Sequence, residues 1–509
     1  MMTDFTLRLR PELSLVRDGA SLSLEDSLLH RTVALDARLG AALSALATPL
    51  SIDAFYRAMA RAQVTRPEAA EALRTLFGLN LFEDTFHELI AGLRARREGF
   101  EPARGRVLGE TRFECLSSGD CCHTHRLGPL RPEDLAYLAA IDPREHYPDV
   151  AWPPVETRTL SNKLSGDFFR ERPEGGCVFL IEERHCGLKR HYREAPPSCQ
   201  RLGLDAVLRA DGVHVYNTGR CHHAQETSDL GPALAKTPRR LLPLMQRPLP
   251  LEHPMVALGQ GVIVDDALYR PWVDEAVEAC NEAQLHPAEI VRLLGRRVLT
   301  LRDQFKQVQP QPGVMGALVQ SLKALPRVRF EVPPRPENLS AGLVAAARLS
   351  EALLQAAERA GGAPLSRDRQ RAEQLKPLAY QLHTLAQAMT EGAPPPERLI
   401  ALGSISLDNP LFTVLNRRQL QQDLFGRGAL LHARAFAGLL RLGLYQWLVA
   451  AAARALNEGQ RVIQERTWGE AHQRALGAVL LPEVESLSLE AEAAAPAFLE
   501  ALPWLVRWR

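Results

Sequence analysis

The first part of the chain changes from an alternating hydrophobic pattern to a helical one. Leucines occupy every second position on both sides of the pair Asp18-Gly19, at Leu13, Leu15, Leu22 and Leu24. Such alternation predicts two strands, and an Asp-Gly pair between them predicts a hairpin turn. A spacing of about 3.6 residues follows, and it predicts helices over 36–47 and 51–62. Thr65 and Glu68 have the spacing of a capping box, which predicts the start of a third helix.

Helical periodicity dominates the second half of the chain. Alanine- and leucine-rich stretches at 341–360 and 429–456 have helix-forming composition and apolar faces. Proline runs at 333–336 and 394–396 predict boundaries or surface loops. The most apolar stretch, 442–453, holds twelve uncharged residues. A helix of that length is too short to cross a hydrocarbon core of about 30 Å, so we expect a buried core helix.

These patterns predict an α+β protein that is mainly α. A length of 509 residues and 46% hydrophobic content are enough for about three well-packed domains. We expect a winged-helix-like module over 1–95, an irregular cysteine-rich core over 101–230 and a large helical domain over 231–509. The last of these has a predicted subdivision near 333–338.

The charge is balanced, with 61 basic and 60 acidic residues and a net charge of +1. Because no global field favours a polyanion, we expect neither nucleic acid nor a membrane surface as a partner. Only six of the basic residues are lysine, which indicates a bacterial source with GC-rich codons. The first ten residues carry charges where a signal peptide has its apolar segment, so the sequence predicts a cytoplasmic, reducing location.

Cysteine is distributed unevenly, since seven of the eight cysteines fall within 115–221. Packing gives no reason for such clustering, whereas a soft metal or an iron-sulfur cluster needs several converging thiolates. The sequence therefore predicts a metal-binding core that holds zinc or an iron-sulfur cluster, with a redox or structural role. The candidate ligands are Cys115, Cys121, Cys122, Cys177, Cys186, Cys199 and Cys221.

Three alternatives to this assignment stay open at the level of sequence. The cysteines can form disulfides, which suits an oxidising compartment, or serve as inert packing thiols. Zinc and iron are not separated by spacing, because both accept four thiolates. The pair His222-His223, directly after Cys221, is the best histidine candidate for an additional ligand, whereas Cys280 lies in a helical segment and is expected to be a packing thiol.

The cysteine order resembles that of the YkgJ-type cysteine-cluster family, which is described as zinc- or iron-chelating. The resemblance rests on the seven clustered cysteines and on the flanking residues Phe179, Leu180 and Pro196. It implies that these cysteines are the metal ligands. Ser118 stands where the family has a further cysteine, so seven thiols are enough for one four-thiolate site but not for two.

A wider resemblance connects the chain to the flagellin lysine-N-methylase family, which combines a similar cysteine core with a long helical region. Its C-terminal part is similar to the stretch 409–412 and the helix around Tyr445 and Trp447. This resemblance implies methyl transfer from S-adenosylmethionine to lysine. The segment Gly259-Gln260-Gly261 precedes an apolar run instead of following one, so it predicts a simple turn and not a nucleotide-binding loop.

The hairpin and three short helices of residues 1–95 resemble the PqqD-like winged-helix modules, whose relatives hold a peptide as an added strand. The resemblance implies a peptide or protein partner at this module, in a scaffold whose middle part is held by a structural metal. A DNA-binding winged helix would carry a basic recognition helix and a basic wing, which this module lacks. The residues leave open whether the chain catalyses a reaction.

Overall fold

The structure is a computed structural model. It describes residues 6–11, 13–18, 21–26, 31–78, 81–82, 105–108, 111–113, 119, 122–123, 127–128, 130, 132–159, 164–173, 175–181, 185–200, 203–209, 212–221, 233–234, 255–259, 263–281, 285–307, 336–362, 366–391, 410–431, 434–456 and 465–507.

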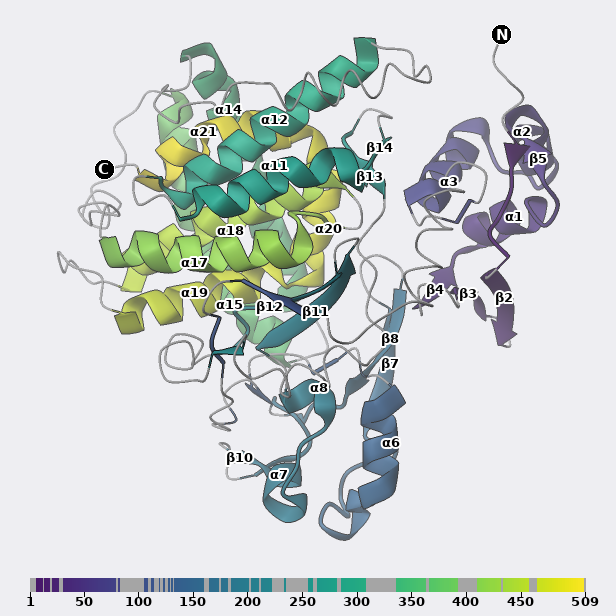
Figure 1. Ribbon diagram of the computed structural model, residues 1–509, viewed down its shortest axis with the longest axis vertical. Helices are drawn as coiled ribbons and strands as arrows, with labels where there is room; N and C mark the ends of the chain where they lie inside the picture. The colour runs from purple at the N-terminus through teal and green to yellow at the C-terminus, as the bar shows by residue number, and fades with distance from the viewer. Residues whose placement is uncertain are drawn as a thin grey trace.

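The described part of the chain is mainly helical with small sheets, which confirms the predicted fold class at that level. Figure 1 shows the later helices gathered into one body, with the N-terminal helices and strands set to one side of it. Strands and short helices of the cysteine-rich region extend below the helical body in this view.

The N-terminal hairpin and helices form where their patterns predict them. Strands β2 (Leu13–Asp18), β3 (Ser21–Asp26) and β4 (Arg31–Leu35) are consecutive and antiparallel. Helices α1 (Ala37–Ala45), α2 (Ile52–Arg61) and α3 (Arg66–Gly78) follow. Two further short strands, β1 (Thr6–Leu7) and β5 (Leu50–Ser51), pair with each other.

Each of these three helices begins at a side chain that satisfies a free backbone amide. The Asp36 carboxylate accepts from Leu39 N at 2.7 Å, and Ser51 Oγ accepts from Ala54 N at 3.2 Å. At α3 the Thr65 amide donates to Glu68 Oε2 at 2.9 Å, which is one half of the predicted capping box.

The five-stranded sheet crosses the boundary that the sequence predicts near residue 100. Its order is β2-β3-β4-β8-β7, and β7 (Val155–Thr159) and β8 (Leu164–Phe169) come from the cysteine-rich region. Strand β8 joins β4 through only two residue pairs, Thr32 with Ser165 and Val33 with Leu164. The N-terminal hairpin is therefore extended by strands that lie more than 120 residues later.

The cysteine-rich region has more regular structure than the irregular core that the sequence predicts. Its helices are α6 (Pro132–Ile141), α7 (Gly187–Tyr192) and α8 (Pro197–Gln200). A small sheet has the order β11-β12-β6, with β6 (Gly105–Val107), β11 (Leu204–Arg209) and β12 (Gly212–Asn217). Two strand pairs complete the region and lead into the helices: β9 (Leu180–Ile181) with β10 (His185–Cys186), and β13 (Met255–Ala257) with β14 (Ile263–Asp265).

The later helices share one apolar core that runs from Val256 to Val506. They are α11 (Asp266–Ala279), α12 (Pro287–Gln307), α14 (Pro336–Gly361), α15 (Ser366–Glu391), α17 (Pro410–Arg427), α18 (Ala435–Leu456), α19 (Glu465–Val479), α20 (Pro482–Glu490) and α21 (Ala495–Arg507). Helices on both sides of 333–338 contribute to this core.

Helix α18 lies at the centre of that core. By length and apolar composition alone it could cross a membrane, but 89% of its most apolar window is buried inside the protein. Trp447 near its middle is fully buried, and Phe498 of α21 lies against it at 5.5 Å between ring centroids. The prediction of a buried core helix at 442–453 is confirmed.

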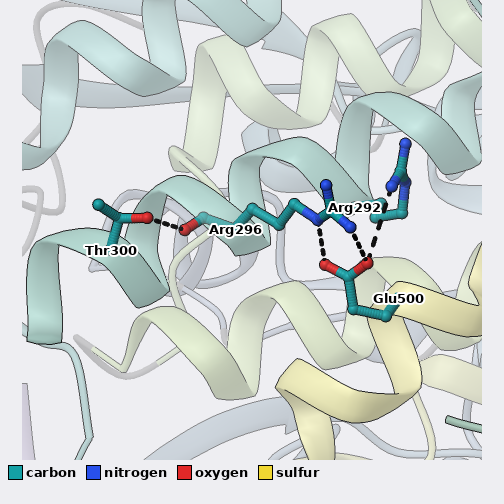
Figure 2. A network of polar contacts seen from close by, with 4 residues as sticks. All are labelled: Arg292, Arg296, Thr300 and Glu500. Atoms are coloured by element: carbon teal, nitrogen blue, oxygen red, sulfur yellow. Dashed lines mark hydrogen bonds and ion pairs between the residues drawn. The ribbon is translucent and has the colours of Figure 1, made fainter. Parts of the chain in front are cut away.

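Helices α12 and α21 are also joined by a compact ion-pair network, shown in Figure 2. Arg296 donates to both carboxylate oxygens of Glu500, and the contact from Nη2 to Oε2 measures 2.6 Å. The Nη1 atom of Arg292 lies 3.7 Å from Glu500 Oε2, and Arg292 is 3% exposed. Thr300, one turn further along α12, donates to the Arg296 carbonyl at 3.0 Å.

Candidate functional site

The structure describes five of the seven predicted ligands, whereas Cys115, Cys121 and the pair His222-His223 lie outside the described residues. All six described cysteines, which include Cys280, are thiols and not disulfides. The disulfide alternative is therefore wrong for these six. Cys280 is 6% exposed within the helical core, which confirms it as a packing thiol.

Four of the predicted ligands gather around one apolar cluster. Its buried members are Leu127, Leu138, Phe169, Cys177, Phe179 and Leu188, and Cys122, Cys186 and Cys199 pack against them. We call Cys122, Cys177, Cys186 and Cys199 the thiol pocket. Sequence analysis was correct that these residues share one region of the fold.

Backbone contacts hold the thiol pocket together. The Cys177 amide donates to the Cys122 carbonyl at 3.1 Å, and Cys186 leads directly into α7. Helix α7 begins at Gly187, where a Cβ would lie 1.7 Å from the hydroxyl oxygen of Tyr147. Only glycine permits this close approach of α7 to the Tyr147 ring.

Helix α6 fixes the fourth thiol from the opposite side. The buried carboxylate of Asp134 accepts from the Ser198 amide at 2.8 Å and also from the Ser198 hydroxyl. The Tyr137 hydroxyl donates to the Glu194 carbonyl at 2.8 Å. These contacts secure the start of α8 and with it Cys199.

The surroundings favour the neutral form of the Cys199 thiol. Burial raises the pKa of Cys199 well above its ordinary value, and the neighbouring Cys177, Cys122 and Cys186 raise it further. Burial also raises the pKa of Tyr147 to about 12. The Cys199 thiol is therefore protonated at neutral pH.

The predicted metal centre is not formed by the residues that the structure describes. In that part of the chain no group of three or more His, Cys, Asp or Glu side chains could hold a metal ion. The prediction of a zinc- or iron-sulfur-binding cysteine cluster is therefore wrong for Cys122, Cys177, Cys186, Cys199 and Cys221. The physical reason is that these side chains do not converge on one point, because four of them pack against an apolar cluster and Cys221 lies against the helical body.

Cys221 lies against the helical body and not in the thiol pocket. Its carbonyl accepts from Gln473 Nε2 of α19 at 3.1 Å. The segment 217–221 that carries it runs from the end of β12 towards α17 and α19. This segment leads to a polar site that the sequence did not indicate.

Three arginines influence one another electrostatically between the small sheet and the helices. Arg220 follows β12, Arg427 is the last residue of α17, and Arg441 lies in α18; all three are half-buried. The half-buried Asp423, one turn before Arg427, influences all three electrostatically. We call Arg220, Arg427, Arg441 and Asp423 the arginine site.

Hydrogen bonds from the helices fix the loop that carries Arg220. The Gly219 carbonyl accepts from His472 Nε2 at 2.9 Å and from Gln473 Nε2 at 3.2 Å. Because a carbonyl can only accept, Nε2 of His472 carries the proton and Nδ1 accepts from the Tyr445 hydroxyl at 2.6 Å. Trp468 stacks on the His472 ring with 4.9 Å between centroids, which completes a buried polar support.

Hydrogen bonds within the loop itself also fix its backbone. The Gly219 amide donates to Asn217 Oδ1 at 2.9 Å, and the Arg220 amide donates to Thr218 Oγ1 at 3.3 Å. Gly219 adopts φ +70°, and a Cβ there would lie 2.6 Å from Gln419 Oε1. A side chain at residue 219 would therefore be strained and would collide with Gln419.

Burial and neighbouring charges shift the pKa values of the arginine site. Burial lowers the pKa of Arg441 to about 10, and repulsion from Arg427 lowers it further. Burial and Arg427 also lower the pKa of Arg220. Burial raises the pKa of Asp423 even though three guanidiniums oppose that shift. The pKa of Arg427 is raised instead, because Arg427 donates to the Tyr216 hydroxyl at 3.2 Å and is stabilised by it.

Sequence reasoning missed this site for an identifiable reason. Arg220 and Arg427 are more than 200 residues apart, and no spacing rule connects them. Arginine is also the common basic residue of this chain, so a single arginine carries no signal.

One further surface bears on the predicted peptide partner. Strand β2 lies at the outer edge of the five-stranded sheet as the structure describes it. Leu15 on this strand is 44% exposed and lies opposite Leu24 of β3, which is 1% exposed and belongs to the module's core. The apolar face of the sheet therefore continues outward to the edge at β2.

Comparison with known proteins adds no relative, since no family model, curated protein or solved structure matches the chain. The three family resemblances and what they imply for methyl transfer and peptide binding stay predictions.

Proposed function

We propose that the chain is a peptide-binding scaffold whose winged-helix-like N-terminal module captures an extended peptide at the β2 edge of its sheet. An edge strand has backbone amides and carbonyls that an added strand can pair with. The observation that supports this most is the exposed Leu15, which offers an incoming strand an apolar neighbour on the core side of the sheet.

The strand order of the sheet also supports peptide capture at β2. Its opposite side is already extended by β8, which reaches β4 from more than 120 residues away. This leaves β2 and β7 as the outer strands among the described elements. Of these two, β2 belongs to the module whose resemblance implies peptide binding.

A peptide selected against the immobilised full-length chain from a random library provides the probe. Fluorescence anisotropy of the labelled peptide then measures affinity for the wild type and for Leu15→Arg. We expect Leu15→Arg to weaken binding at least ten-fold, because a charged side chain would replace the apolar contact beside the added strand. Tyr380→Arg in α15 is the matched control, since Tyr380 is 63% exposed and distant in sequence from the module.

Backbone methylation of the peptide separates strand addition from other docking modes. Only every second amide of an added strand faces the acceptor strand. We therefore expect N-methyl groups at alternate peptide positions to weaken binding and those between them to have little effect. A uniform response, or equal losses in Leu15→Arg and Tyr380→Arg, would reject capture at β2.

Lysine methylation stays a prediction of the resemblance to the flagellin lysine-N-methylases. Calorimetry of the full-length chain with S-adenosylmethionine tests it, and absence of saturable heat would remove it.

A further inference from the structure

We propose that His472 acts as a pH-sensitive latch, which holds the loop 217–221 against α18 and α19 while its ring is neutral and releases the loop when the ring takes up a proton. The latch consists of the His472 side chain and its two hydrogen bonds, to Gly219 and Tyr445. It is separate from the peptide surface at β2, and neither proposal depends on the other.

The first argument is that both ring nitrogens of His472 are engaged. Nε2 donates to the Gly219 carbonyl at 2.9 Å, and Nδ1 accepts from the Tyr445 hydroxyl at 2.6 Å. The neutral ring with its one proton on Nε2 satisfies both partners at once. The loop and α18 are therefore matched to the neutral form of this side chain.

The second argument is the cost of a second proton. A proton on Nδ1 would reverse the contact with Tyr445, because the hydroxyl would have to accept there and turn its own proton elsewhere. His472 is 1% exposed and Tyr445 is 4% exposed, so this exchange takes place away from water. A buried charge with a disturbed hydrogen bond is costly, and separation of the loop from α19 relieves that cost.

The third argument is the packing around the ring. Trp468, one turn earlier on α19, stacks on His472 at 4.9 Å with 8° between the ring planes. The Trp468 indole donates to Asn416 Oδ1 of α17 at 3.0 Å, and Asn416 is fully buried. The ring is therefore held in place between α17, α18 and the loop, and it is not free to turn its new proton towards water.

The fourth argument is the effect of the neighbouring charges. Asp423 of α17 acts electrostatically on Tyr445, and burial raises the pKa of Asp423. This carboxyl is therefore neutralised more readily as the pH falls, whereas the arginines that it influences stay charged, namely Arg220 of the loop, Arg427 of α17 and Arg441 of α18. The field near Tyr445 becomes more positive in acid, which further opposes a charge on His472.

The loop that the latch holds carries Cys221. Gln473, next to His472, donates to the carbonyls of Gly219 and Cys221 at 3.2 and 3.1 Å. Two consecutive residues of α19 thus attach the loop to the helical body. Cys221 is 6% exposed in this closed arrangement, so access to its thiol reports opening of the loop.

Proton linkage gives the direction and the size of the effect. An ordinary imidazole takes up its proton near a pH of about 6.5, so the open loop binds more protons than the closed loop below that pH. The closed arrangement is therefore most stable above that value and loses stability as the pH falls. For a closed ring that stays neutral, the open population rises about 25-fold between pH 7 and pH 5.

The reactivity of Cys221 in the full-length chain tests the proposal. Dithiodipyridine modifies thiols in acid as well as at neutral pH, and mass spectrometry of the peptide that contains Cys221 gives the rate. Division by the rate for the urea-unfolded chain at the same pH removes the pH dependence of the reagent. We expect this ratio to rise at least ten-fold from pH 7 to pH 5, and an unchanged ratio would overturn the proposal.

Two variants assign the response to the latch. In His472→Gln the amide can donate to Gly219 and accept from Tyr445 but does not titrate, so its ratio should change less than two-fold over the same pH range. His383→Gln is the matched control, since His383 is a half-buried histidine on α15. It should keep the wild-type response. A ten-fold rise in His472→Gln, or loss of the response in His383→Gln as well, would overturn the assignment.

Nitrogen NMR of the wild-type chain labelled at its histidine rings provides a test that needs no variant. We expect a ring with its proton on Nε2 at pH 7, and we expect this ring to take up a second proton over the pH range in which Cys221 becomes reactive. A charged His472 ring at pH 7, or proton uptake without a change at Cys221, would contradict the latch.

Discussion

Two groups of arginines in this protein differ in how their charge is compensated. In the network between α12 and α21, Arg296 forms a two-point ion pair with Glu500, and the buried Arg292 lies 3.7 Å from the same carboxylate (Figure 2). In the arginine site, Asp423 influences three guanidiniums electrostatically, and burial still raises its pKa. The first arrangement joins two helices through a shared counterion, whereas in the second burial opposes ionisation of the carboxylate that acts on all three arginines.

Cys199 in the thiol pocket tolerates burial in a third way, because its thiol stays neutral. A buried thiol with a raised pKa carries no charge at neutral pH and needs no counterion. Comparison of the three clusters teaches that residue types alone do not identify a binding site. What distinguishes the arginine site is that burial raises the pKa of its shared carboxylate.

The largest expected effect comes from removing the shared carboxylate of the compensated network. Glu500→Gln leaves Arg292 and Arg296 without their counterion, and Arg292 is 3% exposed. We expect the free energy of unfolding to fall by about 3 kcal/mol, the magnitude typical of a broken buried ion pair. Urea unfolding followed by tryptophan fluorescence measures this change.

Glu275→Gln provides the control, because Glu275 pairs with Arg297 while its own side chain is 46% exposed. Exposed pairs contribute about 0–1 kcal/mol. Equal losses in the two variants would contradict the distinction between a buried network and a surface pair.

The next largest expected effect is slow alkylation of Cys199 in the thiol pocket. Alkylation requires the thiolate, so a raised pKa should make Cys199 react with iodoacetamide at pH 8 at least ten-fold more slowly in the folded protein than in urea. Mass spectrometry of the peptide that contains Cys199 measures both rates. Equal rates in the folded and unfolded protein would show that the pocket does not suppress ionisation.

The smallest effect on stability, and one of different sign, is expected at the arginine site. The folded pKa of Asp423 is raised, so its favourable contribution is complete below the unfolded value of 3.8 and is lost as pH rises through the folded pKa. Asparagine does not ionise, so Asp423→Asn does not lose stability as the pH rises through that pKa. Its stability relative to the wild type should therefore increase between pH 4 and pH 7 and remain within about 1 kcal/mol of it at neutral pH.

Urea titrations of both proteins at several pH values measure that difference. A destabilisation at pH 7 as large as that of Glu500→Gln would show that Asp423 is a compensating counterion after all, and the contrast between the two arginine groups would fail.

Local features were predictable from the sequence because they depend on neighbouring residues. The hairpin around Asp18, the helix that begins after Thr65 and the buried helix around Trp447 follow from alternation, capping and apolar composition. The gathering of Cys122, Cys177, Cys186 and Cys199 was likewise indicated by their density in the sequence.

Long-range features were not predictable. The contact of β4 with β8 consists of two residue pairs, and no pattern in either strand specifies the other. The metal prediction was wrong for the described cysteines because cysteine density reports proximity but not whether the thiols are aimed at one point. The arginine site combines Arg220, which follows β12, with Arg427 of α17, and the packing of β12 against α17 brings the two parts of the chain together.

Urea unfolding of Asp423→Asn and Glu500→Gln at pH 7, each measured against the wild type, tests the contrast between the two arginine groups most directly. We predict a loss of about 3 kcal/mol for Glu500→Gln and a change within about 1 kcal/mol for Asp423→Asn. Equal losses in the two variants would contradict the account.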